Sequence, residues 1–307
     1  MSPSFQLAYN TNGLAHHRLL DAMPMLAELG YTGIAITVDV GHLDPYAPDA
    51  GEVAAVRRLA DLLGLSITIE TGARFVLDPW IKHGPNLMDS LEAGRQRRVD
   101  FYRRCIDLAV ALDAPLISLW AGAEPEGREW ATAPVALRER LAEGLAEVLE
   151  HARAGGVRVG FEPEPGMFLE RPSGYAELRE LLGDRGEGLG LTLDVGHLVV
   201  TGDRPEGAVV RAFADELVHV HLDDCPAGIH QHMPFGEGDL DLLSVLEALL
   251  DVGYAGQAAV ELSRDSHRAP TAVEDAMGAL RKALDRLEDR KRRPQGQESS
   301  PPTDLSS

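Results

Sequence analysis

The feature that most constrains the fold of this 307-residue chain is a regular alternation of short apolar runs with longer amphipathic stretches. Eight apolar runs have the length of a β-strand. Their hydrophobicity is continuous rather than alternating, as expected for parallel strands covered on both faces. The runs are residues 5–9, 33–38, 66–70, 116–120, 157–162, 190–194, 218–222 and 257–262.

The stretches between these runs repeat apolar residues at helical spacing. They are residues 19–29, 52–63, 96–112, 136–154, 175–182, 205–213 and 242–252, with a last helix at about 271–291. Eight strand–helix units predict an α/β fold, a single (β/α)8 barrel (TIM barrel) over residues 1–291. Residues 292–307, rich in Pro, Ser, Gln and Gly, are expected to form a disordered tail.

The charge balance excludes some classes of partner. Acidic side chains outnumber basic ones by 49 to 29, which gives a formal net charge of −20. Such a chain is repelled by phosphate backbones and anionic membrane surfaces, so neither nucleic acid nor a membrane is expected as a partner. No apolar run approaches the roughly 20 residues that span a bilayer. Two cysteines, Cys105 and Cys225, are too few for a disulfide framework and predict a cytoplasmic protein.

Polar side chains occur at the carboxyl ends of the last four predicted strands, where a (β/α)8 barrel places its active site. Glu162 ends the fifth strand and Asp194 ends the sixth, while the seventh carries His221 and the eighth carries Glu261. Successive members are about one strand–helix unit apart. We therefore expect the four side chains to converge in space.

Three carboxylates and an imidazole repel or perturb one another in a small cavity, and a divalent cation removes this conflict. Glu162, Asp194, His221 and Glu261 are thus predicted to bind one divalent metal ion. Ligand type alone leaves Mn²⁺, Mg²⁺, Co²⁺ and Zn²⁺ open. The alternative is that each residue is an ordinary strand-end group that caps a helix or pairs with an arginine.

Several short motifs occur in a fixed order along the chain. They are Phe161-Glu162-Pro163, Asp194-x-x-His197, His219-x-His221-Leu222-x-Asp224, the Phe235-Gly236-Glu237-Gly238-Asp239-Leu240-Asp241 loop, and Tyr254-Ala255-Gly256 leading to Val260-Glu261. Over about residues 5–285 this set resembles the xylose-isomerase-like barrels. That group includes sugar and sugar-phosphate isomerases and epimerases, inosose-processing enzymes and endonuclease-IV-type nucleases.

The resemblance implies one divalent metal on Glu162, Asp194, His221 and Glu261. It also implies that Glu162 and Glu261 move the proton and that His197 contacts the substrate. A metal polarises the carbonyl of an α-hydroxy carbonyl compound and makes its C–H more acidic. One carboxylate then removes the proton and a second returns one on the other side, which gives an epimer or an aldose–ketose isomer through an enediolate.

The expected partner is therefore a small polyol: a sugar, a sugar phosphate or a cyclitol. The same geometry can expel a β-hydroxyl, so a dehydratase remains an alternative. A catalytically silent barrel that binds a metabolite is another. A homo-oligomer is compatible with the resemblance, and the number of subunits stays open.

Other residues carry weaker signals. Arg74 follows the third strand together with Lys82 and is expected to hold a phosphate or carboxylate of the substrate, with a locally paired arginine as the alternative. Glu70 is expected to orient the substrate or Arg74. Asn10 and Trp120, at the ends of the first and fourth strands, are expected to line the pocket, the indole against a sugar face.

Three further histidines need an interpretation. His219 is two residues before His221 on one strand, so both side chains point the same way, and His219 is expected to be a deeper supporting residue. His230 and His232 precede the glycine-rich loop. A plain polar loop is predicted there, with a lid or a second metal contact as the alternatives.

Two observations narrow the family branch. Ketose 3-epimerases carry an arginine six residues beyond the histidine ligand, and this chain has Ala227 there, which disfavours a free-ketose 3-epimerase. Endonuclease-IV-type nucleases use three metals, for which His42, His83, His197, His230 and His232 are possible ligands. The net charge of −20 and the lack of a visible basic stripe argue against duplex DNA as the substrate.

Overall fold

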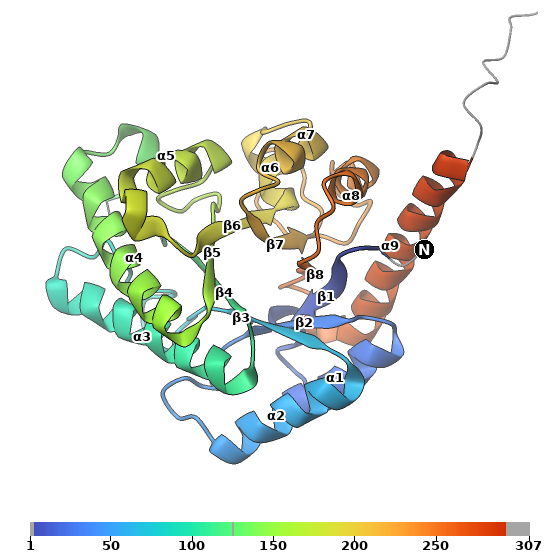
Figure 1. Cartoon of the computed structure of the whole chain (residues 1–307), viewed down its shortest axis with the longest axis horizontal. Helices are drawn as coiled ribbons and strands as arrows, with labels where there is room; N and C mark the ends of the chain where they lie inside the picture. The colour runs from blue at the N-terminus through green and yellow to red at the C-terminus, as the bar shows by residue number, and fades with distance from the viewer. Residues whose placement is uncertain (1–2, 125, 293–307) are drawn as a thin grey trace, which may run out of the picture.

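The computed structural model describes residues 3–124 and 126–292. Its eight strands pair in parallel in chain order, and β8 pairs with β1, so the sheet closes into a barrel (Figure 1). The strands are β1 (Gln6–Asn10), β2 (Gly33–Thr37), β3 (Ser66–Glu70), β4 (Leu116–Trp120), β5 (Arg158–Glu162), β6 (Leu189–Asp194), β7 (Leu217–Leu222) and β8 (Gln257–Val260). The predicted (β/α)8 barrel is confirmed.

Helices cover the outside of the barrel (Figure 1). They are α1 (Leu19–Glu28), α2 (Ala50–Leu63), α3 (Glu92–Leu112), α4 (Val135–Gly155), α5 (Pro172–Leu182), α6 (Val195–Thr201), α7 (Glu206–Ala212), α8 (Leu242–Asp251) and α9 (Ala269–Arg292). The predicted helices are all present with shifted ends. The predicted tail at 292–307 lies outside the described residues except for Arg292, which ends α9.

Helix α6 was not expected. Its sequence from Val195 to Thr201 is short, contains a glycine and β-branched residues, and shows no amphipathic period. The helix begins because the Asp194 carboxylate accepts a hydrogen bond from the backbone N–H of His197 at 2.9 Å. A side-chain cap of this kind satisfies one of the free N–H groups of the first turn.

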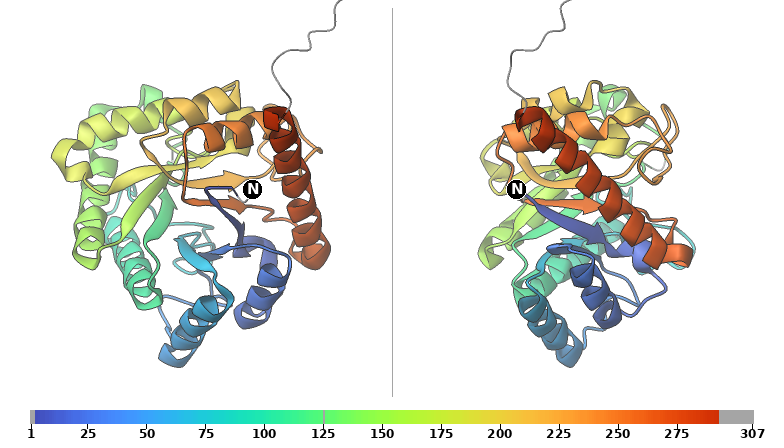
Figure 2. Two further views of the ribbon diagram at one scale, coloured as in Figure 1. Left: turned by 45° about the vertical axis from the view of Figure 1, so that its right-hand side comes forward. Right: turned by 90° about the vertical axis from the view of Figure 1, so that its right-hand side faces the viewer.

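Helix α9 packs against α8 and runs along the outside of the barrel (Figure 2). The Tyr31 hydroxyl donates to the carbonyl of Val273 at 2.9 Å, and the Arg281 guanidinium donates to the carbonyl of Leu29 at 2.7 Å. These contacts join the last helix to the first strand–helix unit. The last helix is therefore fixed to the segment between α1 and β2.

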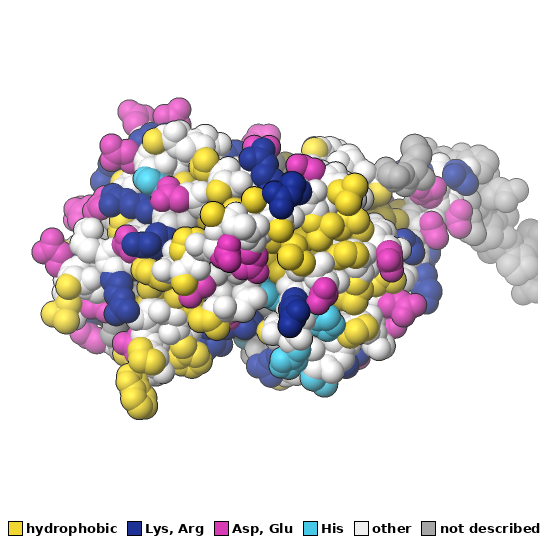
Figure 3. All heavy atoms as spheres, turned by 90° about the horizontal axis from the view of Figure 1, so that it is seen from below, with side chains coloured by type: hydrophobic (Ala, Val, Ile, Leu, Met, Phe, Trp, Pro, Cys, Tyr) yellow, Lys and Arg dark blue, Asp and Glu magenta, His cyan; other side chains and the backbone are white. Residues whose placement is uncertain are grey.

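Among the described residues, none of the helices combines the length and apolarity needed to cross a membrane. On the face drawn in Figure 3, Lys and Arg side chains are interspersed with Asp and Glu, and most of the histidines in view gather in one area. The described residues of this face thus offer no broad basic surface of the kind that follows a DNA backbone.

Candidate metal centre and active site

A cavity of about 710 Å³ lies at the carboxyl ends of the strands. This volume is typical of sites for small molecules. Its lining includes a polar or aromatic side chain from the end of nearly every strand: Asn10, Thr37, Glu70, Trp120, Glu162, His221 and, directly after β8, Glu261. The barrel therefore positions these groups by strand register, because parallel strands end at one rim.

The four residues predicted to bind metal come together at this cavity, and three of them line it. Donor atoms of Glu162, Asp194, His221 and Glu261 all lie within 4.8 Å of one another. His221 Nδ1 is 3.0 Å from Glu162 Oε1, 2.9 Å from Glu261 Oε2 and 3.8 Å from Asp194 Oδ2. Asp194 and His221 are register partners across β6 and β7, so the pairing of the strands sets this part of the geometry.

Burial and charge act against each other in this group. Burial raises the pKa of Glu162 to about 7, although His221 opposes the shift. Burial also disfavours the ionised form of Glu261, but His221 and His232 outweigh it and lower that pKa. The pKa of His221 is well above its ordinary value, because Glu162, Glu261 and Glu70 outweigh its burial. The carboxylates thus favour a positive group among them, either an imidazolium or a divalent cation.

The donor set fits a divalent cation. Asp194 Oδ1 caps α6, whereas Asp194 Oδ2 is buried and has no hydrogen-bond partner within the described part of the chain. A buried carboxylate oxygen without a partner is uncommon in proteins. Three carboxylates and one imidazole nitrogen are ligands that Mn²⁺, Mg²⁺, Co²⁺ and Zn²⁺ all accept.

Glu70 supports this group from the opposite side of the imidazole. Its Oε1 lies 3.0 Å from His221 Nε2 and 2.9 Å from His219 Nε2. Burial raises the pKa of Glu70, but His221 and His219 together lower it to about 2, so the side chain is a carboxylate. A carboxylate on the far nitrogen of a ligating histidine fixes the orientation of its ring. His219 is fully buried, as its place two residues before His221 on the strand predicts.

Arg74 does not contact Glu70, contrary to one of the two expectations for Glu70. Its guanidinium pairs with Asp39 at 3.0 Å and donates to the carbonyl of Asn12 at 3.4 Å. Lys82 and Arg264 also line the cavity, are exposed, and form no ion pair within residues 3–124 and 126–292. Of the three basic side chains, Lys82 and Arg264 are therefore available to bind an anion, whereas Arg74 is already paired with Asp39.

Asn10 and Trp120 both line the cavity, with different constraints. Asn10 is buried, and its side-chain oxygen accepts from the Thr37 hydroxyl at 2.5 Å and from the N–H of Asn12 at 3.1 Å. The Trp120 ring meets the His83 ring edge to face with 5.2 Å between centroids. Asn10 thus mainly shapes the rim, whereas Trp120 presents an aromatic surface to the cavity.

Asn12 is a site residue that the sequence reasoning missed. Its side-chain N–H donates to Glu261 Oε1 at 2.6 Å. It lies in the turn two residues beyond β1, where no strand-end pattern marks it. His42, which was considered as a metal ligand, instead contacts the carbonyl of His17 at 2.8 Å and is absent from the cavity lining.

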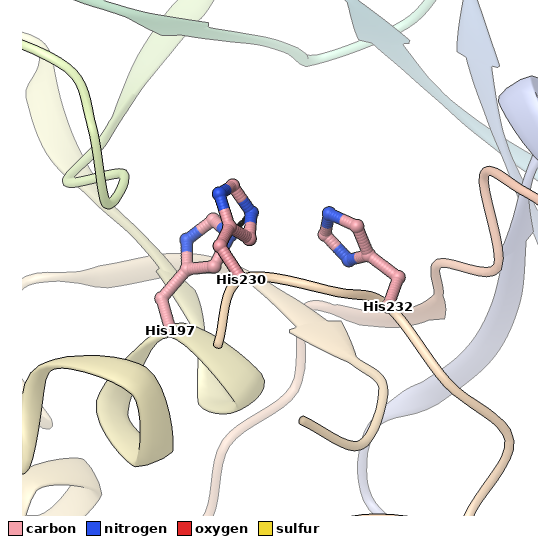
Figure 4. A group of neighbouring side chains, drawn as sticks. All are labelled: His197, His230 and His232. Atoms are coloured by element: carbon pink, nitrogen blue, oxygen red, sulfur yellow. Dashed lines mark hydrogen bonds between the residues drawn. The ribbon is translucent and has the colours of Figure 1, made fainter. Parts of the chain in front are cut away.

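His197 lies in the first turn of α6 and meets His230 and His232 from the loop after β7 (Figure 4). A plain polar loop was expected for these two, and the structure instead folds them over the cavity. Asp224 holds the loop, because its carboxylate accepts from three backbone N–H groups, those of Gly236, Gly238 and Leu240, at 2.8, 3.0 and 2.9 Å.

Asp223, the residue before this anchor, was also missed. Its Oδ2 lies 2.7 Å from His232 Nδ1. Asp223 is fully buried against Gly196, and a side chain at position 196 would collide with its carboxylate. The glycine in the Asp194-x-x-His197 motif therefore makes room for a second buried aspartate.

Comparisons with known proteins agree with this architecture. The sequence profile of the xylose isomerase-like TIM barrel family matches residues 24–283. Fructoselysine 3-epimerase of Shigella flexneri is 27% identical over 245 residues, which cover 77% of this chain and 82% of that protein. Inosose dehydratase of Lacticaseibacillus casei is 25% identical over 43% of this chain and 49% of its own length.

Several other curated relatives are matched over about half to three fifths of their length. Among solved structures, L-ribulose 3-epimerase superposes with a TM-score of 0.74 at 19% identity, covering 95% of this chain and 100% of that one. This likeness shows the fold. Because the family profile matches most of the chain, from α1 into α9, the assignment does not depend on one motif. The protein belongs to the xylose isomerase-like TIM barrel family.

Proposed function

We propose that this protein is a divalent-metal-dependent isomerase or epimerase that acts on a sugar, a sugar phosphate or a cyclitol by proton transfer through an enediolate. The observation that carries the proposal is the meeting of Glu162 and Glu261 at one nitrogen of His221, at 3.0 and 2.9 Å. The two carboxylates come from β5 and from the end of β8, which are three strands apart in the barrel. They therefore reach the centre from different directions, as acid and base on two sides of a substrate must.

The metal would be held by Glu162, Asp194, His221 and Glu261. Their oxygen-rich donor set and the unpartnered Asp194 Oδ2 support this assignment. When bound, the ion would polarise the substrate carbonyl. Glu70 would keep the His221 ring oriented, and the Asn12 amide would hold the Glu261 carboxylate through its 2.6 Å hydrogen bond.

The cavity walls support a polyol substrate. Its lining is mainly polar, and Trp120 offers an aromatic face on which the apolar side of a sugar ring can stack. His197, buried beside Glu162 at 3.7 Å, would act on the substrate from the α6 side. Lys82 and Arg264 at the mouth suit a phosphate or carboxylate at the end of the substrate distant from the metal.

A dehydratase is the second candidate, and Glu164 is the observation that favours it. This third glutamate also lines the cavity. Burial, and next to it the charge of Glu162, raises the pKa of Glu164 well above the ordinary range, which favours the protonated form. A neutral carboxyl group beside a proton-abstracting carboxylate can donate its proton to a leaving hydroxyl. One relative is an inosose dehydratase, which supports the same alternative.

The test is incubation of the Mn²⁺-loaded enzyme in D₂O with ketoses, their phosphates and inososes, followed by NMR. The proposal expects one deuteron at a carbon next to the carbonyl and the appearance of an epimer or isomer. Loss of water with an absorbing enone product would instead establish the dehydratase. No solvent exchange with any of these compounds, in a protein that holds its metal, would contradict both and favour the silent barrel. An abasic-site duplex serves as the nuclease control.

A further inference from the structure

The loop between β3 and α3 places one more histidine at the cavity. His83 lines it next to Trp120, and the planes of the two rings meet at 82°. Within the described part of the chain, His83 belongs to no group of side chains close enough together to hold a metal ion. We propose that His83 binds the substrate: its neutral imidazole donates a hydrogen bond from Nε2–H to an oxygen of the bound polyol. This inference rests on the proposed polyol substrate and not on the reaction that follows binding.

One contact fixes the position of the proton on the ring. The backbone N–H of Arg74 donates to His83 Nδ1 at 3.0 Å. A backbone amide can only donate, so Nδ1 offers its lone pair, and a neutral imidazole then carries its single proton on Nε2. Among residues 3–124 and 126–292, Nε2 has no hydrogen-bond partner and is not sealed from solvent. A donor is therefore available where a ligand in the cavity would lie.

The charges around the ring favour the same neutral form. The pKa of His83 is lowered to about 3, chiefly by burial. Lys82, Arg98 and Arg74 contribute in the same direction. Within the described residues the ring forms no ion pair with a carboxylate, and Asp39 is paired with Arg74 at 3.0 Å. Near pH 7 the imidazole thus donates a hydrogen bond but adds no charge.

The backbone of His83 is held from two sides. Its N–H donates to the carbonyl of Arg74 at 2.6 Å, and its carbonyl accepts from the guanidinium of Arg98. Arg98 also donates to the carbonyl of Pro85 at 2.8 Å. This arginine of α3 is 2% exposed, packs against two aromatic rings and forms no ion pair within the described residues. Burying a guanidinium is costly unless its N–H groups are hydrogen-bonded, and here those bonds fix the segment that carries His83.

The loop is strained where His83 and Arg74 meet. The φ angle is +62° at His83 and +40° at Arg74. Residues other than glycine seldom adopt this left-handed region, and they persist there where surrounding contacts over-determine them, as at ligand sites. In this conformation the two residues exchange two hydrogen bonds, one to the Arg74 carbonyl and one to the His83 ring. The loop therefore orients the imidazole.

A neutral N–H suits a hydroxyl group, because an alcohol oxygen accepts a hydrogen bond without needing a countercharge. The positive charge beside the ring belongs instead to the exposed Lys82. Polyols carry hydroxyl oxygens around an apolar ring face, and Trp120 offers an aromatic surface for that face. Since the His83 ring is almost perpendicular to the indole, the two side chains would contact a polyol from two directions.

Two substitutions separate a binding role from a role in loop structure. The amide of asparagine can replace Nδ1 of histidine, and the amide of glutamine can replace Nε2. His83→Asn therefore keeps an acceptor for the Arg74 N–H but removes the donor, whereas His83→Gln keeps a donor at the Nε2 position. His16→Asn is the matched control, because His16 also lines the cavity but is exposed and forms no hydrogen bond within the described residues.

Calorimetry on the Mg²⁺-loaded proteins measures the Kd of D-fructose, D-fructose 6-phosphate and an inosose. His83→Asn is expected to raise the Kd of the polyols that bind by about 3–10-fold, the effect of losing one neutral hydrogen bond. The increase should be equal for the neutral and the phosphorylated ketose. His83→Gln and His16→Asn should stay close to the wild type. A larger effect of His83→Gln than of His83→Asn, an effect confined to the phosphorylated ketose, or no effect at all would overturn the inference.

NMR of wild-type protein labelled with ¹⁵N-histidine serves if the variants do not fold. The His83 ring should show the Nε2–H tautomer from pH 5 to pH 8, and its Nε2 signal should shift when a polyol is added. An Nδ1–H tautomer, protonation within this range or an unmoved signal with polyol bound would overturn the inference. Binding without turnover would contradict the isomerase proposal and leave this inference standing. Failure of the metal-loaded wild type to bind any of the three polyols would overturn the inference together with the proposed substrate class.

Discussion

Glu70 Oε1 lies 3.0 Å from His221 Nε2, while Nδ1 of the same ring faces Glu162 and Glu261. The imidazole is thus held between a supporting carboxylate from β3 and the carboxylates that would share a metal with it. The same Oε1 also lies 2.9 Å from His219 Nε2, so a single carboxylate oxygen contacts two imidazole rings.

Removing this support should weaken metal binding without removing a ligand. Glu70→Ala is expected to raise the Kd of the ion by about 10–100-fold, and Glu70→Gln by less, because the amide oxygen can still accept a hydrogen bond. Calorimetry with Mn²⁺ measures the effect. At saturating metal concentration the kcat of the variants should be close to that of the wild type, although their Kd for the metal stays raised. An unchanged Kd in Glu70→Ala would show that His221 is held in place by packing alone.

The two glutamates on either side of His221 should both be essential for turnover. Glu162→Gln and Glu261→Gln are each expected to lower kcat by about 10²–10⁴-fold, the range for loss of a positioned acid or base. The melting temperature of both should stay near that of the wild type. Glu237→Gln, an exposed glutamate of the loop after β7, is the matched control. Activity retained in both site variants would refute the proton-transfer mechanism.

Metal affinity should rise with pH. In the metal-free protein the pKa of His221 is well above its ordinary value and that of Glu162 is about 7. At pH 6, protons therefore compete with the metal ion for these two side chains. Deprotonated groups bind the ion, so affinity increases as pH rises from 6 to 8 and binding releases protons. Calorimetry in buffers of different ionisation enthalpy counts the protons released. A Kd that is constant over this range, with no proton release, would contradict the assignment of these ligands.

The cations at the cavity mouth should discriminate charged from neutral substrates. Lys82→Ala and Arg264→Ala are expected to raise KM several-fold for a phosphorylated substrate and to leave KM for its neutral analogue unchanged, because both side chains are uncommitted. Arg74 is paired with Asp39. If Arg74 binds the anion directly, Arg74→Ala gives the same pattern as the other two. If it only organises the mouth, both KM values rise alike.

Much of the architecture was predictable because it depends on local periodicity. The strands from Ser66 to Glu70 and from Leu116 to Trp120 coincide with the apolar runs, since a strand covered on both faces must be apolar throughout. Strand ends were off by one or two residues elsewhere. Helix α6 was missed because its start depends on one hydrogen bond from His197 N–H to Asp194, which no periodic pattern records.

The same division holds for the site. Glu162, Asp194, His221 and Glu261 could be grouped from the sequence, because parallel strands of a closed barrel bring their carboxyl ends to one rim. The side chains that contact these four residues could not be predicted from the sequence. Asn12 reaches Glu261 from a turn 249 positions away along the chain, and no repeat in the sequence encodes that approach.

The sequence by itself thus determined the barrel and the four side chains that converge at its rim, because strand length, strand number and strand-end chemistry are local properties. Only the tertiary structure decided which carboxylate supports His221, that Arg74 is neutralised by Asp39, and that His230 folds back onto His197. Those contacts depend on the paths of the loops after β2, β3 and β7. Such paths are set by side-chain anchors such as Asp224, and these become recognisable only when the backbone they hold is seen.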